Sequence, residues 1–245
     1  MDASLYQQMR EQEDHHWWFK GRRAIVASQL QASELPNQAK ILDLGCGTGG
    51  NLAMLSQFGD VVGVELDETA AQMASDRSVA PVIRGRLPGA LPLSEASFDC
   101  VTLLDVLEHI ADDRATLNAV NTLLKPHGRI LMTVPAFPFL WGPHDEAHHH
   151  QRRYRAKPLA ALLRDTGFEV TYLSYCNTWL FPPAAIVRLV RKILPQGDAG
   201  TELALPPMGL NVMLAMLFAS ERHLLRYMRL PFGISLLVTA KKLPE

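Results

Sequence analysis

Two stretches of the sequence bring together residue types that could do chemistry. The first is the glycine-rich turn Gly45-Cys46-Gly47-Thr48-Gly49, which follows a short apolar run ending in Asp43-Leu44. Glycine allows positive φ and lets a ligand approach the backbone closely. A helical pattern beginning at Leu52 would add unpaired N–H groups and the positive end of a helix dipole. The stretch predicts a ligand site between a strand and a helix, with a bare structural turn as the alternative.

A carboxylate after the next apolar run sharpens this prediction. Residues 61–64 read as a buried strand, and Glu65 stands at its carboxyl end, where such a side chain accepts hydrogen bonds from ribose hydroxyls. The turn reads G-x-G-x-G, whereas nicotinamide dehydrogenases carry G-x-G-x-x-G, and no Gly-Lys-Ser/Thr of a P-loop follows. The pattern therefore predicts a ribose-containing cofactor and argues against both of those classes.

The stretch from Asp43 to Gly49 resembles the first motif of the class I S-adenosylmethionine-dependent methyltransferases, and Glu65 matches their second motif. The resemblance covers residues 38–175 and, by topology, 233–241. It implies methyl transfer with S-adenosyl-L-methionine as cofactor. Many relatives carry an acidic residue after the third strand to bind adenine, whereas this chain has Gly85-Arg86-Leu87. The residues expected to bind the cofactor are Asp43, Gly45, Cys46, Gly47, Gly49, Asn51, Glu65, Leu66, Leu87, Asp105, Val106 and His109.

The second stretch, residues 135–154, follows the expected fifth strand and is rich in histidine. It resembles a methyltransferase subgroup with Trp-Gly-x-His-Asp followed by a His-x-Arg-Arg-Tyr-like run. A hydroxyl acceptor needs a base, and imidazole suits that role near neutral pH. We expect the catalytic residues to be His144, Asp145, His149 and Tyr154, with Asp145 fixing a histidine tautomer. We expect the substrate to contact Trp17, Trp18, Phe19, Trp141, Arg152 and Arg153. A solvated surface loop is the alternative.

A metal site is a rival interpretation of the same stretch. His144-Asp145-Glu146-Ala147-His148 differs from the H-E-x-x-H zinc motif by one residue, with Asp where the Glu belongs. Some O-methyltransferases of the family that this chain resembles use a divalent ion, but with mainly carboxylate ligands. We therefore predict that the protein has no metal site.

The elements that must position these residues follow from apolar periodicity. The resemblance implies an α/β fold: a Rossmann-like seven-stranded sheet with an antiparallel last strand. Two amphipathic helical stretches, 184–194 and 209–228, interrupt the hairpin before that last strand. The predicted organisation is an N-terminal aromatic and helical lid (1–37), a cofactor-binding core (38–176), a helical insert (177–231) and the final strand of the core (232–245).

Composition limits the partners. The formal net charge of -1 gives no global attraction to nucleic acid. Three cysteines without metal or disulfide spacing favour buried free thiols and a reducing compartment. The polar N-terminus does not read as a signal peptide, and no apolar run is long enough to span a bilayer. We therefore expect a cytoplasmic protein. The arginines and methionines of the insert leave open a peripheral membrane contact, a homodimer face or plain core packing.

The sequence thus predicts an S-adenosylmethionine-dependent methyltransferase acting on a small-molecule or lipid-like acceptor, by O-methylation with a histidine general base. Two alternatives remain open. One is S- or N-methylation by proximity, which needs no such base. The other is a non-catalytic partner protein that binds the cofactor or a membrane surface.

Overall fold

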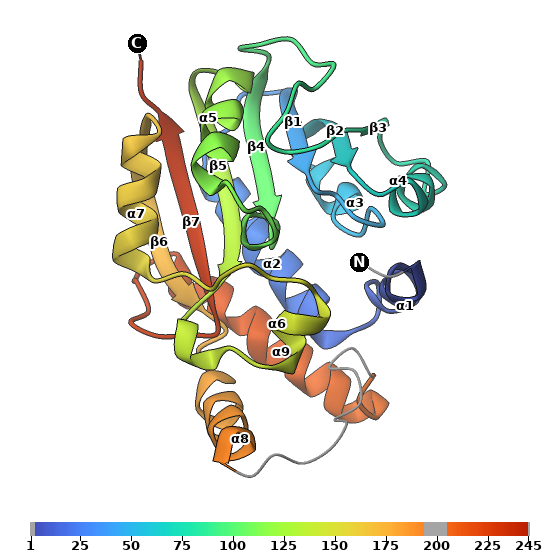
Figure 1. Cartoon of the computed structure of the whole chain (residues 1–245), viewed down its shortest axis with the longest axis vertical. Coiled ribbons are helices and arrows are strands. Elements are labelled where there is room, and N and C mark those ends of the chain that lie inside the picture. Colours follow the sequence, from blue (N-terminus) through green and yellow to red (C-terminus); the bar gives the residue numbers. More distant parts are fainter. Residues whose placement is uncertain (1–2, 194–204, 245) are drawn as a thin grey trace.

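The computed structural model describes residues 3–193 and 205–244, and these form a seven-stranded sheet flanked by helices (Figure 1). The strand order is β3-β2-β1-β4-β5-β7-β6. β7 pairs antiparallel with β5 and β6, and the other pairs are parallel. This confirms the predicted fold class. The strands are β1 (Ala39–Leu44), β2 (Gly59–Glu65), β3 (Val82–Arg84), β4 (Phe98–Leu104), β5 (Leu124–Pro135), β6 (Phe168–Cys176) and β7 (Ser235–Lys242).

Helices cover both faces of the sheet, which explains why its central strands are nearly continuous apolar runs. One face packs against Leu117 and Val120 of α5 and against Leu159 and Leu163 of α7. The other face packs against α2, α3 and the insert helix α9. The helices are α1 (Ala3–Gln12), α2 (Trp17–Ala32), α3 (Leu52–Leu55), α4 (Glu68–Ser75), α5 (Asp113–Leu123), α6 (Pro143–Ala147), α7 (Ala156–Asp165), α8 (Phe181–Ile193) and α9 (Met208–Leu225), with short 3-10 turns η1 (Leu107–His109) and η2 (Pro138–Leu140).

The helix α2 begins at Trp17, so Trp17, Trp18 and Phe19 lie inside it; the ring nitrogen Nδ1 of His16 accepts from the Trp18 N–H at its start. The strand β5 begins at Leu124, and a register shift against β4 between Phe98 and Cys100 accommodates its first residues.

The insert and the N-terminal helices pack together. A Cβ at Gly21 of α2 would lie 2.3 Å from Cδ1 of Phe218 in α9, so the absence of a side chain there lets the two helices approach. The Trp17 N–H donates to Oδ1 of Asn211 over 2.8 Å. Glu221 of α9 is buried and accepts from the backbone N–H groups of residues 177–179, which follow β6. The insert is thereby joined both to the end of the sheet and to α2.

None of the helices within residues 3–193 and 205–244 is long and apolar enough to cross a membrane. The three cysteines are free and buried.

Candidate cofactor and acceptor site

A cavity of about 1240 Å³ lies where β1, β2, β4 and β5 end. Open α/β sheets bind their ligands at this edge, outside the carboxyl ends of the strands. The cavity walls come from the glycine-rich turn, α1 and α2, the residues after β4, the histidine segment and α8. Figure 1 shows α6, α8 and α9 together at one end of the molecule. Segments far apart in sequence therefore enclose one site.

The glycine-rich turn follows β1 and has three glycines at positive φ. Gly45, Gly47 and Gly49 have φ of 70°, 57° and 83°. A Cβ on Gly45 would lie 2.7 Å from Val106, and one on Gly49 would lie 3.0 Å from Ala74. A Cβ on Gly47 would meet nothing within 4 Å. Packing thus excludes side chains at the outer glycines, whereas Gly47 borders open space in the cavity.

The Glu65 carboxylate lies beside this turn at the end of β2. Its Oε2 accepts from the Gly47 N–H over 2.9 Å, and its Oε1 accepts from the N–H groups of Leu66 and Asp67 over 2.8 and 2.9 Å. These three bonds fix its orientation, and a carboxylate can accept about four. Glu65 lines the cavity with its remaining acceptor capacity.

Asp43 and Gly49 were expected to contact the cofactor, but neither lines the cavity. The Asp43 side chain is 1% exposed and accepts from the Thr102 hydroxyl of β4 over 2.7 Å. Burial raises the pKa of Asp43 to about 6, against the opposing effect of the Thr102 hydrogen bond. Asp43 therefore lies beneath the turn, because it is in register with Thr102 of the neighbouring strand β4 and the two side chains share one face of the sheet.

The other residues expected to bind the cofactor do line the cavity. Asp105, directly after β4, has φ of 60° and pairs with Arg22 of α2; it also accepts from the Thr133 hydroxyl over 3.0 Å. The Arg22 guanidinium lies 4.5 Å from the ring centre of Trp18. The expected residues that line the cavity are Gly45, Cys46, Gly47, Asn51, Glu65, Leu66, Leu87, Asp105, Val106 and His109.

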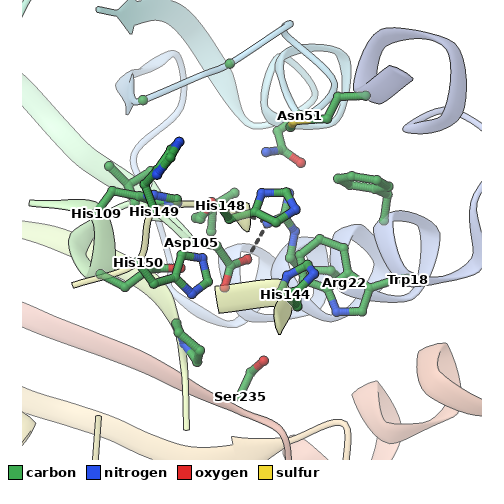
Figure 2. Close-up of a pocket in the computed structure, with 18 of the residues that line it drawn as sticks. Trp18, Arg22, Asn51, Asp105, His109, His144, His148, His149, His150 and Ser235 are labelled. Carbon is green, nitrogen blue, oxygen red and sulfur yellow. Dashed lines mark hydrogen bonds and ion pairs between the residues drawn. The ribbon is translucent and has the colours of Figure 1, made fainter. Parts of the chain in front are cut away.

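Five histidines line the opposite part of the cavity: His109, His144, His148, His149 and His150. Figure 2 shows them around Asp105 and Arg22. Burial, and then the neighbouring histidines, lower the pKa of His144 to about 3 and those of His109 and His148 to about 4. These three imidazoles are therefore neutral near pH 7, and a neutral imidazole carries a lone pair on one ring nitrogen that could accept a proton or bind a cation.

Asp145 orients His150, which was not among the expected catalytic histidines. Its Oδ1 lies 2.8 Å from Nδ1 of His150 and accepts from Nε of Arg153 over 2.8 Å, while Oδ2 accepts from the Gly142 N–H over 2.9 Å. Burial alone would raise the pKa of Asp145, but its hydrogen bonds and the charge of Arg153 hold the pKa below the ordinary value. Asp145 does not line the cavity. Its role is to position His150.

Three further expectations are corrected by the structure. Tyr154 was expected to be catalytic, but it is buried in the core and its hydroxyl donates to Asp113 over 3.1 Å. Arg152 was expected to bind substrate, but it forms an ion pair with the same Asp113 at 2.7 Å. Neither Arg152 nor Trp141 lines the cavity. Arg153 does, although its guanidinium is held by Asp145 and the Ala136 carbonyl. The chain turns after β5, which directs Tyr154 inward.

The aromatic residues of α2 lie as expected, since Trp17, Trp18 and Phe19 line the cavity. Glu13 also lines the cavity, although no pattern in the sequence pointed to it. Glu13 is 4% exposed, accepts from the Thr48 hydroxyl over 2.5 Å and pairs with Arg77. This buried carboxylate ties the segment between α1 and α2 to the glycine-rich turn. Arg22 and Glu108 are also lining residues that sequence reasoning missed as site residues.

Replacing Asp145 with alanine is expected to destabilise the protein by about 3–5 kcal/mol, because it leaves the buried Arg153 without its carboxylate. At about 2–4 °C per kcal/mol for a chain of this size, the melting temperature should fall by roughly 10 °C. Calorimetry measures this. The matched control is Glu146→Ala, which removes the neighbouring exposed carboxylate and should shift the melting temperature little. Equal small shifts of the melting temperature in both variants would contradict a stabilising role for the buried contact between Asp145 and Arg153.

Comparison with known proteins identifies the family. The family model described as "Methyltransferase domain" matches residues 9–173. A ubiquinone biosynthesis O-methyltransferase of Chromobacterium violaceum is 33% identical over 141 residues, which are 49% of this chain and 57% of that protein. A 27-O-demethylrifamycin SV methyltransferase of Amycolatopsis mediterranei is 27% identical over 146 residues, 53% of this chain and 54% of that protein.

The matched segments span 35%, 61% and 37% of the lengths of the first three curated relatives. Among solved structures, an S-adenosylmethionine-dependent methyltransferase from Mesorhizobium loti aligns with a TM-score of 0.56 at 19% identity, covering 87% of this chain and 96% of that one. At this identity the alignment supports the fold.

Proposed function

The chain belongs to the methyltransferase domain family whose model matches residues 9–173, and from this premise we propose that it transfers the methyl group of S-adenosyl-L-methionine to a hydroxyl of an apolar small molecule. The observation that carries this proposal is the cavity, which has the glycine-rich turn and Glu65 on one side and neutral imidazoles on the other. One side suits the cofactor, and the other suits an acceptor that must lose a proton.

On the cofactor side, Glu65 accepts the ribose hydroxyls and the turn at Gly47 lies against the methionine end. The positive φ of Gly47 and the open space beside it support this placement. Val106 and Leu87 supply apolar contacts near the adenine of the cofactor. Arg22 and Asp105 form a fixed ion pair at the centre of the cavity, between the two halves of the site.

On the acceptor side, the walls are mainly apolar. Trp17, Trp18 and Phe19 of α2 act as an aromatic lid, and the insert adds Leu180, Val187 and Leu214. Such a surface favours a flat or lipid-like acceptor and excludes water from the reacting atoms. The names of the two relatives, the ubiquinone biosynthesis O-methyltransferase and the 27-O-demethylrifamycin SV methyltransferase, denote methyl transfer to oxygen, which supports a hydroxyl acceptor.

Methyl transfer is an in-line displacement for which the cofactor carries the reactivity and the protein positions the acceptor. The acceptor oxygen forms a bond to the methyl carbon while the carbon–sulfur bond breaks, and the hydroxyl proton passes to an imidazole. His144 and His149 are our first candidates for that base, because both line the cavity. The Asp145 carboxylate lies 2.8 Å from Nδ1 of His150, so the imidazole that it orients is His150.

Replacing Glu65 with alanine is expected to weaken S-adenosylmethionine binding by about 1–3 kcal/mol, because the ribose hydroxyls lose their acceptor. Calorimetric titration measures the affinity, and circular dichroism checks the fold, since Glu65 also fixes the turn. Glu68→Ala, three residues away and exposed, is the matched control and should leave the affinity unchanged. An unchanged affinity in Glu65→Ala would remove the ribose assignment.

Formation of S-adenosylhomocysteine tests the function directly. The purified protein is incubated with the cofactor and three matched sets of aromatic acceptors that carry a hydroxyl, an amine or a thiol at the same position. We expect turnover with hydroxyl acceptors, and mass spectrometry should place the added methyl on oxygen. Turnover restricted to amines or thiols would refute O-methylation. Cofactor binding with no turnover on any set would favour a non-catalytic partner protein.

Exposed apolar side chains on α8 and α9 favour a lipid-like acceptor taken from a bilayer surface. Ile186, Met208 and Met216 are 62%, 84% and 63% exposed, and exposed arginines at 222 and 226 could meet anionic lipid. We expect flotation with vesicles containing phosphatidylserine and a clear loss in the double variant Met213→Asp, Met216→Asp. Unchanged flotation of that variant would remove the membrane proposal. A shift from dimer to monomer in light scattering would assign the surface to a homodimer.

A further inference from the structure

Glu108 is the least expected charged residue of the site. It lies in η1 directly after β4, its side chain is 0% exposed, and neither carboxylate oxygen has a hydrogen-bond partner within the described residues. Burying a carboxylate without a partner is costly, so buried charges in proteins are normally paired or bound to a cation. A residue in this position requires either a proton or a bound ion.

Two imidazoles lie beside this carboxylate. A ligand atom from each of Glu108, His109 and His150 can be chosen so that all three lie within 4.8 Å of one another. The rings of His109 and His150 are 4.7 Å apart at an interplanar angle of 84°. Bonds of about 2.0–2.2 Å to a common zinc ion would place its ligand atoms roughly 3–4 Å apart. Small side-chain rotations therefore suffice to close the three groups around one ion.

The surroundings of the two histidines match those of metal ligands. Nδ1 of His150 is bonded to Asp145, which leaves Nε2 as the ligand atom. Asp145 is held in turn by Arg153 and by the Gly142 N–H. The His109 ring makes a backbone hydrogen bond with His148. Metal-binding histidines usually bond their second nitrogen to a carboxylate or a backbone carbonyl in this way, which fixes the tautomer and the ring orientation.

We propose that Glu108, His109 and His150 bind a divalent transition-metal ion, represented by Zn²⁺, at the acceptor end of the cavity. Two imidazoles and one carboxylate form a ligand set of catalytic zinc sites and of other transition-metal sites with open positions. The same three residues line the cavity, so the open positions face the acceptor. This replaces the expectation that no metal is bound, and it uses different residues from the His144–His148 pattern.

The proposal deepens the proposed function and rests on it for the chemistry. An ion at this place would coordinate the acceptor oxygen and lower the pKa of its hydroxyl, so that the proton passes to a neighbouring imidazole. The oxygen then bonds to the methyl carbon, and the carbon–sulfur bond breaks with its electron pair remaining on sulfur. Catechol-like acceptors with two adjacent hydroxyls would fit two open positions of one ion.

The test is metal binding by the full chain after treatment with a chelator and removal of that chelator. Calorimetric titration with ZnCl₂ should give one equivalent at saturation. Glu108→Gln, His109→Asn and His150→Ala should each weaken binding by about 100-fold or more. His223→Ala is the matched control, since it removes an exposed histidine of α9 far from the cluster, and it should bind as the wild type does. Titration with Co²⁺ should give visible absorption bands that His150→Ala loses.

Folding of the variants is controlled separately. The metal-free Glu108→Gln protein should melt near the metal-free wild type, because the amide has the size of the carboxyl but no charge. Zn²⁺ should raise the melting temperature of the wild type and not that of Glu108→Gln. Equal zinc stabilisation in both proteins, or wild-type titrations without saturation, would overturn the site.

This outcome is separable from that of the proposed function. Zinc binding is measured without cofactor or acceptor, and S-adenosylmethionine binding is measured on metal-free protein. A protein that binds zinc with the expected variant pattern but forms no S-adenosylhomocysteine would sustain the metal site and refute the methyltransferase activity. A protein that forms S-adenosylhomocysteine at full rate after chelation and binds no zinc would sustain the methyltransferase activity and refute the metal site.

Discussion

Replacing Gly47 with valine is expected to abolish S-adenosylmethionine binding while the sheet stays intact. Gly47 has φ of 57°, a conformation that is strained for a β-branched residue. Nothing in the protein lies within 4 Å of its Cβ position, so the valine side chain would project into the space assigned to the cofactor. The substitution should therefore lower the cofactor affinity more than the stability of the fold. Calorimetric titration should show no saturation at millimolar cofactor.

Gly209→Val is a matched control for this variant. Gly209 lies in the first turn of α9, and nothing surrounds its Cβ position within 4 Å, but its φ is not positive and it does not line the cavity. It should bind the cofactor as the wild type does. The cofactor affinity of Gly47→Ala should lie between those of Gly47→Val and Gly209→Val. Normal binding by Gly47→Val would mean that the cofactor occupies another part of the cavity.

Alanine substitution of the catalytic histidine is expected to lower the single-turnover rate by about 10²–10⁴-fold. We expect this for one of His144, His148 and His149, with little change in cofactor affinity because these side chains lie on the acceptor side. His223→Ala again serves as the control. Full activity in all three variants would refute these three imidazoles as the base and leave proximity, or a base outside this set, as the mechanism.

The pH profile distinguishes among these histidines. The pKa values of His144 and His148 are lowered to about 3 and about 4, so either imidazole stays unprotonated from pH 8 down to about pH 5. If one of them is the base, the rate should be flat over this range, because protonation removes the base only below its pKa. A fall in rate between pH 8 and about pH 5 would exclude both His144 and His148 as the base.

Local patterns were sufficient for the fold and for the cofactor half of the site. The strand, turn and helix around Gly45 to Gly49 are contiguous, and the period of apolar residues reveals strands whose two faces are both covered. Asp67 caps the helix α4, which follows Glu65, by accepting from the Ala70 N–H over 3.0 Å. Such features depend on residues only a few positions away in the chain, so they can be predicted from the sequence.

The acceptor half depends on contacts between distant segments, which sequence spacing cannot show. Asp145 stands next to His144 in the chain, yet it bonds to His150, because a short helix turns the two neighbours in different directions. The Gln151 N–H donates to the Glu108 carbonyl over 2.7 Å, and this bond brings His150 to Glu108 and His109 across some forty residues. Tyr154 is buried in the core, and its backbone pairs with the residues at the end of β5, since its N–H donates to the Pro135 carbonyl over 2.8 Å. Sequence alone therefore determined the sheet and the turn that faces the cofactor, whereas the tertiary packing of the residues after β4 and β5 decided which histidines and carboxylates meet.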